Sequence, residues 1–328
     1  MYQQHFGLRE LPFTLTPNTH FYLNLPTHQE AFNLIMVAMG NGDGFVKIVG
    51  EVGTGKTLLC RKVLNALSQE HLCDQPLSTG ATGSETTSVK DSRYVSAYIP
   101  NPNLTPDGFR MNFARELGVA MEGLKGSYDL LERLNQKLLE LAADNKQVVL
   151  IVDEAQTMPE ETIEALRLLT NLETETSKLF QVVLFGQPEL DELLDRRSLR
   201  QLKQRITFSY QLKLLDQEGT GQYIQHRIAL AGYNGMPIFD QKAMKLLHKA
   251  SVGTPRLINI LSHKTLMSAY GKGDRQVQPE HVRLAAADTE GVSLPSSRAL
   301  FAKTGLAVLF IAAIGLAVGL LLDKGLIP

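Results

Sequence analysis

The first two thirds of the chain alternate between short apolar runs and longer amphipathic stretches. Runs with the length and composition of β-strands lie within residues 44–50, 92–100, 147–156, 179–190 and 196–215. Between the first two runs, residues 58–67 carry their apolar side chains at helical spacing. The run 147–156 is continuously apolar until it reaches two acids, which indicates a strand buried on both faces, as parallel strands are. The pattern therefore predicts an α/β core with a parallel sheet.

The pattern changes after residue 215. Residues 216–290 show helical apolar spacing, most clearly in YIQHRIALAG and QKAMKLLHKAS, and they predict a small helical domain. Residues 304–322 differ again, because nineteen consecutive positions carry no charge. As a helix they would be about 28 Å long, close to the thickness of the hydrocarbon core of a bilayer. We predict that this segment spans a membrane.

The predicted layout follows the chain in order. It comprises an N-terminal segment with the first helix (1–43), an α/β core (44–215), a helical domain (216–290), a linker (291–303), a transmembrane helix (304–322) and a short tail (323–328). Within the core, residues 74–91 are rich in Ser, Thr and Gly and have few apolar side chains to repay the entropy of ordering. We therefore expect a flexible insertion there.

Charge and cysteine content exclude several classes of protein. The chain has 33 Lys and Arg residues against 34 Asp and Glu residues, for a formal net charge of −1. This balance gives no overall attraction to a polyanion, so we expect no nucleic-acid partner. Cys60 and Cys73 are too few for a disulfide framework, and no Cys/His cluster has zinc-ligand spacing. We expect a reducing compartment and no structural metal.

The clearest motif is GEVGTGKT at residues 50–57, which fits the phosphate-binding pattern GxxxxGKS/T (Walker A, or P-loop) between a predicted strand and a predicted helix. The backbone N–H groups of such a loop converge on phosphate oxygens. Lys56 is expected to reach the β- and γ-phosphates, and Thr57 to offer its hydroxyl to Mg²⁺. The residues expected to contact the nucleotide are Gly50, Glu51, Val52, Gly53, Thr54, Gly55, Lys56, Thr57 and Leu58. ATP and Mg²⁺ are the predicted ligands.

A second candidate group, Asp153 and Glu154, follows the apolar run of residues 147–156. Ligands of open α/β sheets bind beyond the carboxyl ends of the strands, where these acids are expected (Walker B). Successive strand side chains point to opposite faces, so the two carboxylates are expected to have different roles. We assign Asp153 to the magnesium ion and Glu154 to the orientation of the attacking water, which phosphoryl transfer requires.

These motifs, in this order, resemble the AAA+ ATPases. Within that class, FGL at residues 6–8 and LPF at residues 11–13 are similar to the start of the secretion-pathway subfamily of ExeA/GspA proteins. The greatest similarity is to its MSHA pilus-biogenesis ATPases of the MshM type. The resemblance extends from residue 1 to about residue 291. It implies an α/β P-loop ATPase core followed by a small helical lid domain.

The resemblance also implies roles for four further residues. Gln187 ends the strand within residues 179–190, where AAA+ proteins usually place Asn, Thr or Ser to hold the γ-phosphate or water. Either Arg205 or Arg200 is expected to act in trans as an arginine finger, which requires a homo-oligomer. Arg256, in SVGTPRLIN, is expected to reach back to the γ-phosphate from the lid.

The function that this resemblance implies is ATP hydrolysis that drives assembly or remodelling of a type IV pilus (MSHA type) or a type II secretion apparatus. The partners would be inner-membrane components of that apparatus. Arg298 and Lys303 precede the predicted span, whereas Lys324 follows it beside Asp323, so we expect the ATPase body on the cytoplasmic side of a bacterial inner membrane. Two alternatives stay open: a DNA-associated AAA+ ATPase of the initiator or transposition type, and a slow-cycling nucleotide-dependent scaffold.

Overall fold

The computed structural model describes residues 2–14, 21, 23–69, 92–172, 178–292 and 294. The predicted insertion 74–91, the predicted transmembrane helix 304–322 and the tail 323–328 lie outside these residues. Among the helices of the described part, none is long and apolar enough to cross a bilayer.

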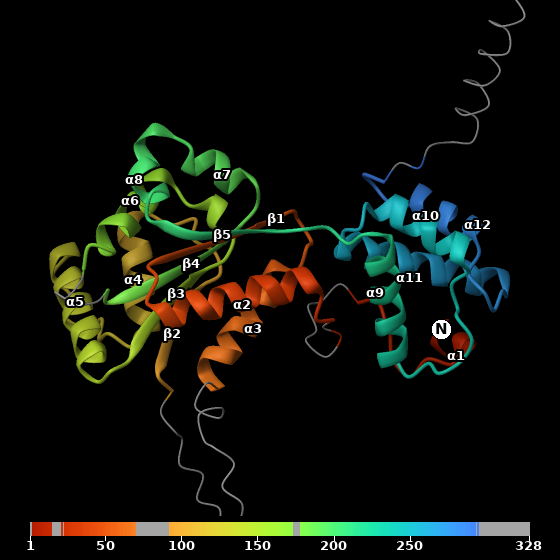
Figure 1. Ribbon diagram of the computed structural model, residues 1–328, viewed down its shortest axis with the longest axis horizontal. Coiled ribbons are helices and arrows are strands. Elements are labelled where there is room, and N and C mark those ends of the chain that lie inside the picture. Colours follow the sequence, from red (N-terminus) through yellow and green to blue (C-terminus); the bar gives the residue numbers. More distant parts are fainter. Residues whose placement is uncertain are drawn as a thin grey trace, which may run out of the picture.

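The central element is a parallel sheet of five strands in the order β2-β3-β4-β1-β5 (Figure 1). The strands are β1 (Phe45–Gly50), β2 (Tyr94–Ile99), β3 (Gln147–Val152), β4 (Phe180–Gly186) and β5 (Ile206–Leu212). Each coincides with one of the apolar runs in the sequence, so the predicted α/β class with a parallel sheet is confirmed. Because the strands are parallel, the loops that follow β1, β3 and β4 all lie at the same edge of the sheet.

The helices fall into three groups. Those around the sheet are α2 (Pro26–Asn41), α3 (Lys56–Gln69), α4 (Pro106–Glu116), α5 (Ser127–Ala143) and α6 (Glu160–Leu169). Short helices near the carboxyl edge are η3 (Ala155–Thr157), α7 (Glu189–Leu194), η4 (Arg197–Leu199) and α8 (Arg200–Lys203). The helices after β5 form the helical domain, which is called the lid below. They are α9 (Gln217–Leu230), α10 (Gln241–Ser251), α11 (Pro255–Lys272) and α12 (Pro279–Ala287), and α1 (Tyr2–Phe6) packs beside them.

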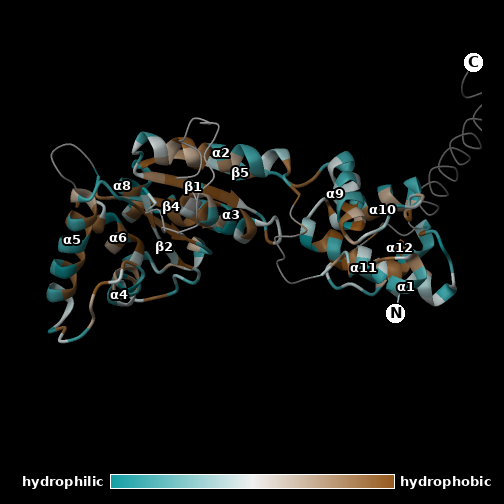
Figure 2. Ribbon diagram, turned by 90° about the horizontal axis from the view of Figure 1, so that it is seen from below, coloured by the Kyte–Doolittle hydropathy of each residue, from teal (hydrophilic) through white to brown (hydrophobic). Residues whose placement is uncertain are grey.

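The sheet is the middle layer of a three-layer core. In β3, Val148, Leu150 and Val152 belong to the hydrophobic cluster with α4, α5 and α6. The alternate residues Val149 and Ile151 belong to the cluster with α2 and α3. Both faces are therefore buried, as the continuous apolar run predicts. Figure 2 shows this arrangement as hydrophobic strands between helices whose outer sides are hydrophilic.

The N-terminal segment packs on the lid and not on the sheet. Tyr2 and Phe6 of α1 share a hydrophobic cluster with Ile258 and Leu261 of α11, and Figure 1 shows α1 beside the lid helices. Helix α2, by contrast, packs against β1 and β5. The predicted N-terminal unit 1–43 therefore packs against two different parts of the molecule. Helix α1 packs on the lid, and α2 covers the core.

Candidate active site

The phosphate-binding loop joins β1 to α3. Strand β1 ends at Gly50 and α3 begins at Lys56, as the motif predicts. The first N–H groups of an α-helix have no partner within the helix, so the start of α3 offers donors and a partial positive charge at this point. Gly53 has a φ of 80°, a left-handed conformation that favours glycine. The loop therefore has the backbone geometry that a phosphate group requires.

Lys56 is the first residue of α3, and its side chain reaches back to the start of this loop. Its side chain is 5% exposed, and Nζ donates hydrogen bonds to the carbonyl oxygens of Gly50 (2.6 Å) and Glu51 (3.0 Å). Burial lowers the pKa of Lys56, while the nearby carboxylates of Glu154 and Asp153 raise it. The ammonium thus donates to oxygen atoms, and the oxygens of a bound phosphate can replace these carbonyl oxygens as acceptors.

Thr57 and Asp153 form the expected metal-binding pair. The Thr57 hydroxyl donates to Asp153 Oδ2 at 2.9 Å, and Asp153 Oδ1 accepts the backbone N–H of Glu154 at 2.9 Å. Burial raises the pKa of Asp153, and the hydrogen bond from Thr57 opposes this rise. A hydroxyl and a carboxylate are the oxygen ligands that Mg²⁺ prefers beside nucleotide phosphates. The residues present therefore fit a magnesium ion that arrives with the nucleotide.

Glu154 lies beyond the end of the strand. Strand β3 ends at Val152, and Glu154 is left-handed with φ 51° and ψ 39°. Its Oε2 accepts hydrogen bonds from Gln187 Nε2 (3.0 Å) and Gln156 Nε2 (2.6 Å). Asp153 and Glu154 do point to different partners, but the left-handed turn separates them, not the alternation of a strand.

The lid reaches the loop through the segment that contains Arg256. Gly253 has a φ of 75°, and a Cβ there would lie 1.9 Å from the carbonyl oxygen of Leu215, so no larger residue fits. Helix α11 begins two residues later, and the backbone N–H of Arg256 donates to the Gly53 carbonyl at 3.2 Å. The Arg256 side chain is exposed. It is therefore free to turn toward a nucleotide without breaking an interaction in the core.

The cleft between core and lid has a volume of about 400 Å³ and brings most of the predicted residues together. Its lining includes Val52, Gly53, Gly55, Lys56, Thr57, Leu58, Glu154, Gln187 and Arg256. Lid residues and the N-terminal segment close the other side. A site assembled from three strand ends and a lid is suited to a nucleoside triphosphate.

The phosphate-binding loop, both acids and Gln187 lie in a segment that matches a known domain family. The profile of the AAA domain family matches residues 39–194. The chain carries an AAA domain. General secretion pathway protein A of Aeromonas hydrophila is 38% identical over 300 residues, which cover 89% of this chain and 49% of that protein. The chain thus spans about half the length of this curated relative.

Solved structures share the fold of the AAA domain and lid. Cdc6p of Pyrobaculum aerophilum has a TM-score of 0.60 with 16% identity, covering 86% of this chain and 74% of that one. The Aeropyrum pernix ORC1 protein in complex with DNA has a TM-score of 0.58 with 19% identity, covering 84% and 69%. At this level of identity the likeness shows the fold alone. The AAA domain and its phosphate-binding loop make the chain an ATPase.

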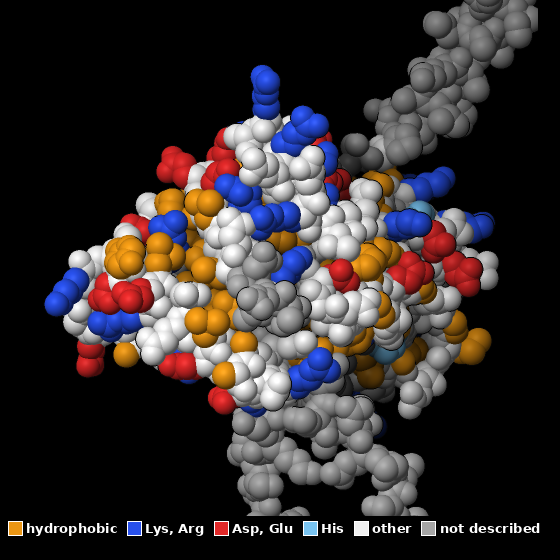
Figure 3. All heavy atoms as spheres, turned by 60° about the vertical axis from the view of Figure 1, so that its left-hand side comes forward, with side chains coloured by type: hydrophobic (Ala, Val, Ile, Leu, Met, Phe, Trp, Pro, Cys, Tyr) orange, Lys and Arg blue, Asp and Glu red, His pale blue; other side chains and the backbone are white. Residues whose placement is uncertain are grey.

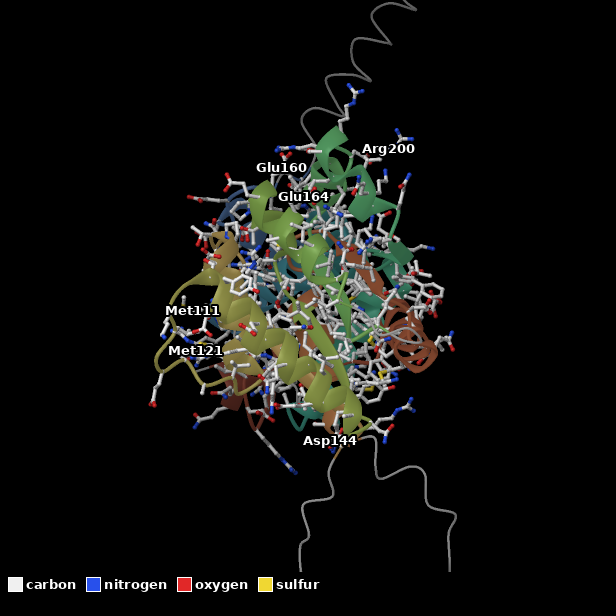
Figure 4. The ribbon with its side chains drawn as sticks, turned by 90° about the vertical axis from the view of Figure 1, so that its left-hand side faces the viewer. Met111, Met121, Asp144, Glu160, Glu164 and Arg200 are labelled. Atoms are coloured by element: carbon white, nitrogen blue, oxygen red, sulfur yellow. The ribbon has the colours of Figure 1, made fainter. Side chains whose placement is uncertain are left out.

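The two candidate arginine fingers differ in their surroundings. Arg205 is tied to its own AAA domain, because its guanidinium donates to Thr170 Oγ1 (2.9 Å) and Asn171 Oδ1 (2.5 Å) at the end of α6. The Arg200 side chain is exposed and, within the described part of the chain, makes no hydrogen bond or ion pair. Figure 4 shows Arg200 at the outer edge of the molecule, and Figure 3 shows Lys and Arg side chains gathered at the same end.

His28 is a site residue that the sequence did not indicate. It lies in the first turn of α2, is 4% exposed, and its Nε2 is 2.9 Å from the Thr54 carbonyl. A carbonyl can only accept, so Nε2 carries the hydrogen. Burial lowers the pKa of His28, the hydrogen bond to Thr54 raises it, and the charge of Lys62 lowers it. A lone histidine in a helix gives no sequence signal of a contact 26 residues away.

The lid wall of the cleft contains a second group that the motifs did not reveal. Arg227 is 5% exposed, donates from Nε to the Pro12 carbonyl at 2.6 Å and from Nη1 to the Tyr223 hydroxyl at 2.8 Å, and lies 4.8 Å from the centre of the Phe21 ring. Tyr223 and Arg227 line the cleft. Their four-residue spacing in α9 is visible in the sequence, but there it indicates only a helix.

Among the described residues, one group of three side chains has the spacing of a metal site: Asp274, Glu280 and His281 in the lid. The backbone N–H of Gln278 donates to His281 Nδ1 at 3.0 Å. In the neutral ring the hydrogen is therefore on Nε2, the nitrogen that faces Asp274 at 3.1 Å. This nitrogen lies close to the carboxylate without forming a hydrogen bond, and with its hydrogen in place it has no lone pair for a metal.

Proposed function

We propose that this ATPase converts binding and hydrolysis of Mg²⁺-ATP into a change of angle between AAA domain and lid, and that this change assembles or remodels a type II secretion apparatus or a type IV pilus of the MSHA type. The observation that carries the proposal is the cleft, in which the phosphate-binding loop, Glu154, Gln187 and Arg256 line one space between the two bodies, with Asp153 hydrogen-bonded to Thr57 of its lining. The similarity to General secretion pathway protein A supports the choice of apparatus.

Each residue has a defined part in this mechanism. The loop amides and Lys56 would hold the β- and γ-phosphates, and Thr57 with Asp153 would hold the metal, whose charge would offset that of the phosphates. Glu154 orients the attacking water with its carboxylate, and Gln187 steadies that carboxylate from the neighbouring strand. Arg256 contacts the γ-phosphate from the lid. Because Arg256 moves with α11, loss of the γ-phosphate releases the lid.

We propose further that Arg200 is the arginine finger and that the active form is a homo-oligomer. Arg205 is already engaged by Thr170 and Asn171, whereas Arg200 is exposed and its charge is available to a neighbouring subunit. Arg200→Ala is expected to lower kcat by about a thousandfold, and Arg205→Ala to act mainly through stability.

A mixing experiment tests the finger in trans. The Arg200→Ala chain retains its own Glu154, and the Glu154→Gln chain retains its own Arg200, so a mixture of the two inactive variants is expected to recover turnover. Specific activity of the unmutated chain is expected to rise with protein concentration. A mixture as inactive as its components, together with a flat concentration profile, would rule out a trans arginine.

The membrane is part of the proposal, with residues 304–322 as an anchor and the ATPase body in the cytoplasm. The full chain is expected in the membrane fraction after alkaline extraction, and a chain lacking residues 304–322 in the soluble fraction. Recovery of both chains in the soluble fraction would contradict the anchor.

The apparatus is tested in the bacterium that encodes the chain. Deletion of the gene is expected to abolish either surface pili or exoprotein secretion, and Glu154→Gln is expected to be dominant-negative over the unmutated copy. Normal pili and normal secretion in the deletion strain would contradict the proposal. Turnover that rises with duplex DNA, lost at high salt, would favour the DNA-associated alternative instead.

A further inference from the structure

Gln156 stands between the catalytic acid and the strand that carries Gln187. Its Oε1 accepts the backbone N–H of Gln187 at 3.0 Å, and its Nε2 donates to Glu154 Oε2 at 2.6 Å. A backbone N–H can only donate, so the carbonyl end of the Gln156 amide must face Gln187. The NH₂ end then necessarily faces the carboxylate. The orientation of this side chain is therefore fixed by its partners.

The two amides act on one oxygen of Glu154. Oε2 accepts from both Gln156 and Gln187, which leaves Oε1 for a water molecule in the cleft. The backbone of Glu154 is left-handed, a conformation that a non-glycine residue adopts only when its surroundings hold it there. A carboxylate on such a turn has several rotamers available, and two donors from different elements select one of them.

Gln156 also separates two spaces. Glu154 and Gln187 line the nucleotide cleft, whereas Gln156 lines a groove on the outer side, between the starts of α6 and α7, together with Glu160 and Glu192. The amide thus forms part of the wall behind the catalytic carboxylate. Its loss would leave Glu154 with one donor and would open its back to bulk water.

We propose that Gln156 is a positioning residue for hydrolysis: it holds Glu154 in the rotamer that orients the attacking water and couples that rotamer to the Gln187 end of β4. The inference rests on the proposed role of Glu154. Displacement of a reacting group by about 1 Å can cost about a hundredfold in rate. Gln156 is thus expected to affect kcat and to leave nucleotide binding almost unchanged, because it lies behind the carboxylate and away from the phosphate-binding loop.

The test compares Gln156→Met and Gln156→Glu in the full chain. Methionine keeps the volume but removes both hydrogen bonds, so kcat is expected to fall at least about tenfold, with KM for ATP within about twofold. The carboxyl group introduced by Gln156→Glu can replace the amide only when protonated, with its O–H donating to Glu154 and its carbonyl accepting from Gln187. Its kcat relative to the unmutated chain is therefore expected to be highest near pH 5.5 and to fall toward pH 8.5.

Thr157→Val is the matched control. It removes a hydrogen bond from the same short helix to the Glu154 carbonyl, but leaves both donors on the carboxylate, so kcat is expected to stay within about twofold. A Gln156→Met kcat within twofold of the unmutated value, or a Gln156→Glu defect equal at all pH values, would overturn the inference. Failure of the proposed function looks different, since Glu154→Gln would then hydrolyse ATP as fast as the unmutated chain.

Discussion

The two walls of the nucleotide cleft are built in different ways. On the core side, Lys56, Thr57, Asp153, Glu154 and Gln187 are joined by short hydrogen bonds among themselves or to the loop backbone. On the lid side, Arg256 touches the loop through its backbone N–H, and its side chain is exposed. The core wall is organised before nucleotide arrives, whereas on the lid wall the charge of Arg256 is not yet engaged.

This difference separates the two tasks of a nucleotide-driven machine. A preorganised wall lowers the barrier to hydrolysis, because donors and carboxylates need no rearrangement during the reaction. The lid wall gains its main contact from the γ-phosphate, so it can change position when that phosphate leaves. A ligand shifts the balance between two lid positions only if it binds one of them more tightly than the other. Variants on the two walls should therefore fail in distinguishable ways.

The largest effect is expected on the core wall, from Glu154→Gln. The amide keeps the shape of the side chain but cannot attract the proton of the attacking water, so kcat should fall by about a thousandfold or more. The Kd for Mg²⁺-ATP should change by less than about threefold. Phosphate release measures kcat, and calorimetry on the same preparation measures Kd. A loss of Mg²⁺-ATP binding as large as the loss of kcat would contradict the assignment of Glu154 to hydrolysis alone.

A smaller effect is expected on the lid wall, from Arg256→Ala. Loss of the guanidinium should lower kcat about thirtyfold, equivalent to about 2 kcal/mol, and should remove the nucleotide-dependent movement of the lid. Fluorescent probes on exposed Lys249 of α10 and on half-buried Lys137 of α5, each replaced by cysteine in a Cys60→Ala, Cys73→Ala background, would report this movement. An ATP-dependent change in transfer efficiency that survives in Arg256→Ala would contradict the assignment.

The smallest effect is expected behind the loop, at His28. Burial holds its pKa below the ordinary value of about 6.5, so the unfolded chain takes up the proton first as pH falls. The contribution of His28 to the free energy of unfolding is therefore complete above pH 6.5 and declines below it. His28→Leu should cost about 1 kcal/mol at pH 8 and flatten this decline. Denaturant titrations at pH 8 and pH 5.5 measure it, and an unchanged slope with pH would contradict the role of His28.

The core wall could be predicted from the sequence because its residues follow local rules. The P-loop is contiguous, and Asp153 and Gln187 come directly after apolar runs that can only be buried parallel strands. His28 and Gln156 could not be predicted in the same way. Their contacts depend on the rotamer of a side chain and on elements 26 and 31 residues away, and neither position breaks a helical or strand pattern.

On the lid side, too, the sequence predicts the helices but not the contacts between distant segments. The helical spacing of residues 216–290 predicts the lid, but not that α1 packs on it, since an apolar face of five residues gives no indication of its partner. Arg227 is similar. In the sequence its position indicates only a helix, whereas in the structure Pro12, Tyr223 and Phe21 bury it. Contacts between segments more than 200 residues apart follow from packing and not from local pattern.

Every role assigned to this cleft requires the phosphate-binding loop to take up Mg²⁺-ATP, and calorimetric titration of the full chain and of Lys56→Ala measures this directly. The unmutated chain is expected to bind Mg²⁺-ATP at one site per chain. Lys56→Ala should bind about a hundredfold more weakly, because it leaves the phosphate charge without its buried partner. Equal affinity of the two proteins, or no binding by either, would contradict the assignment of this cleft.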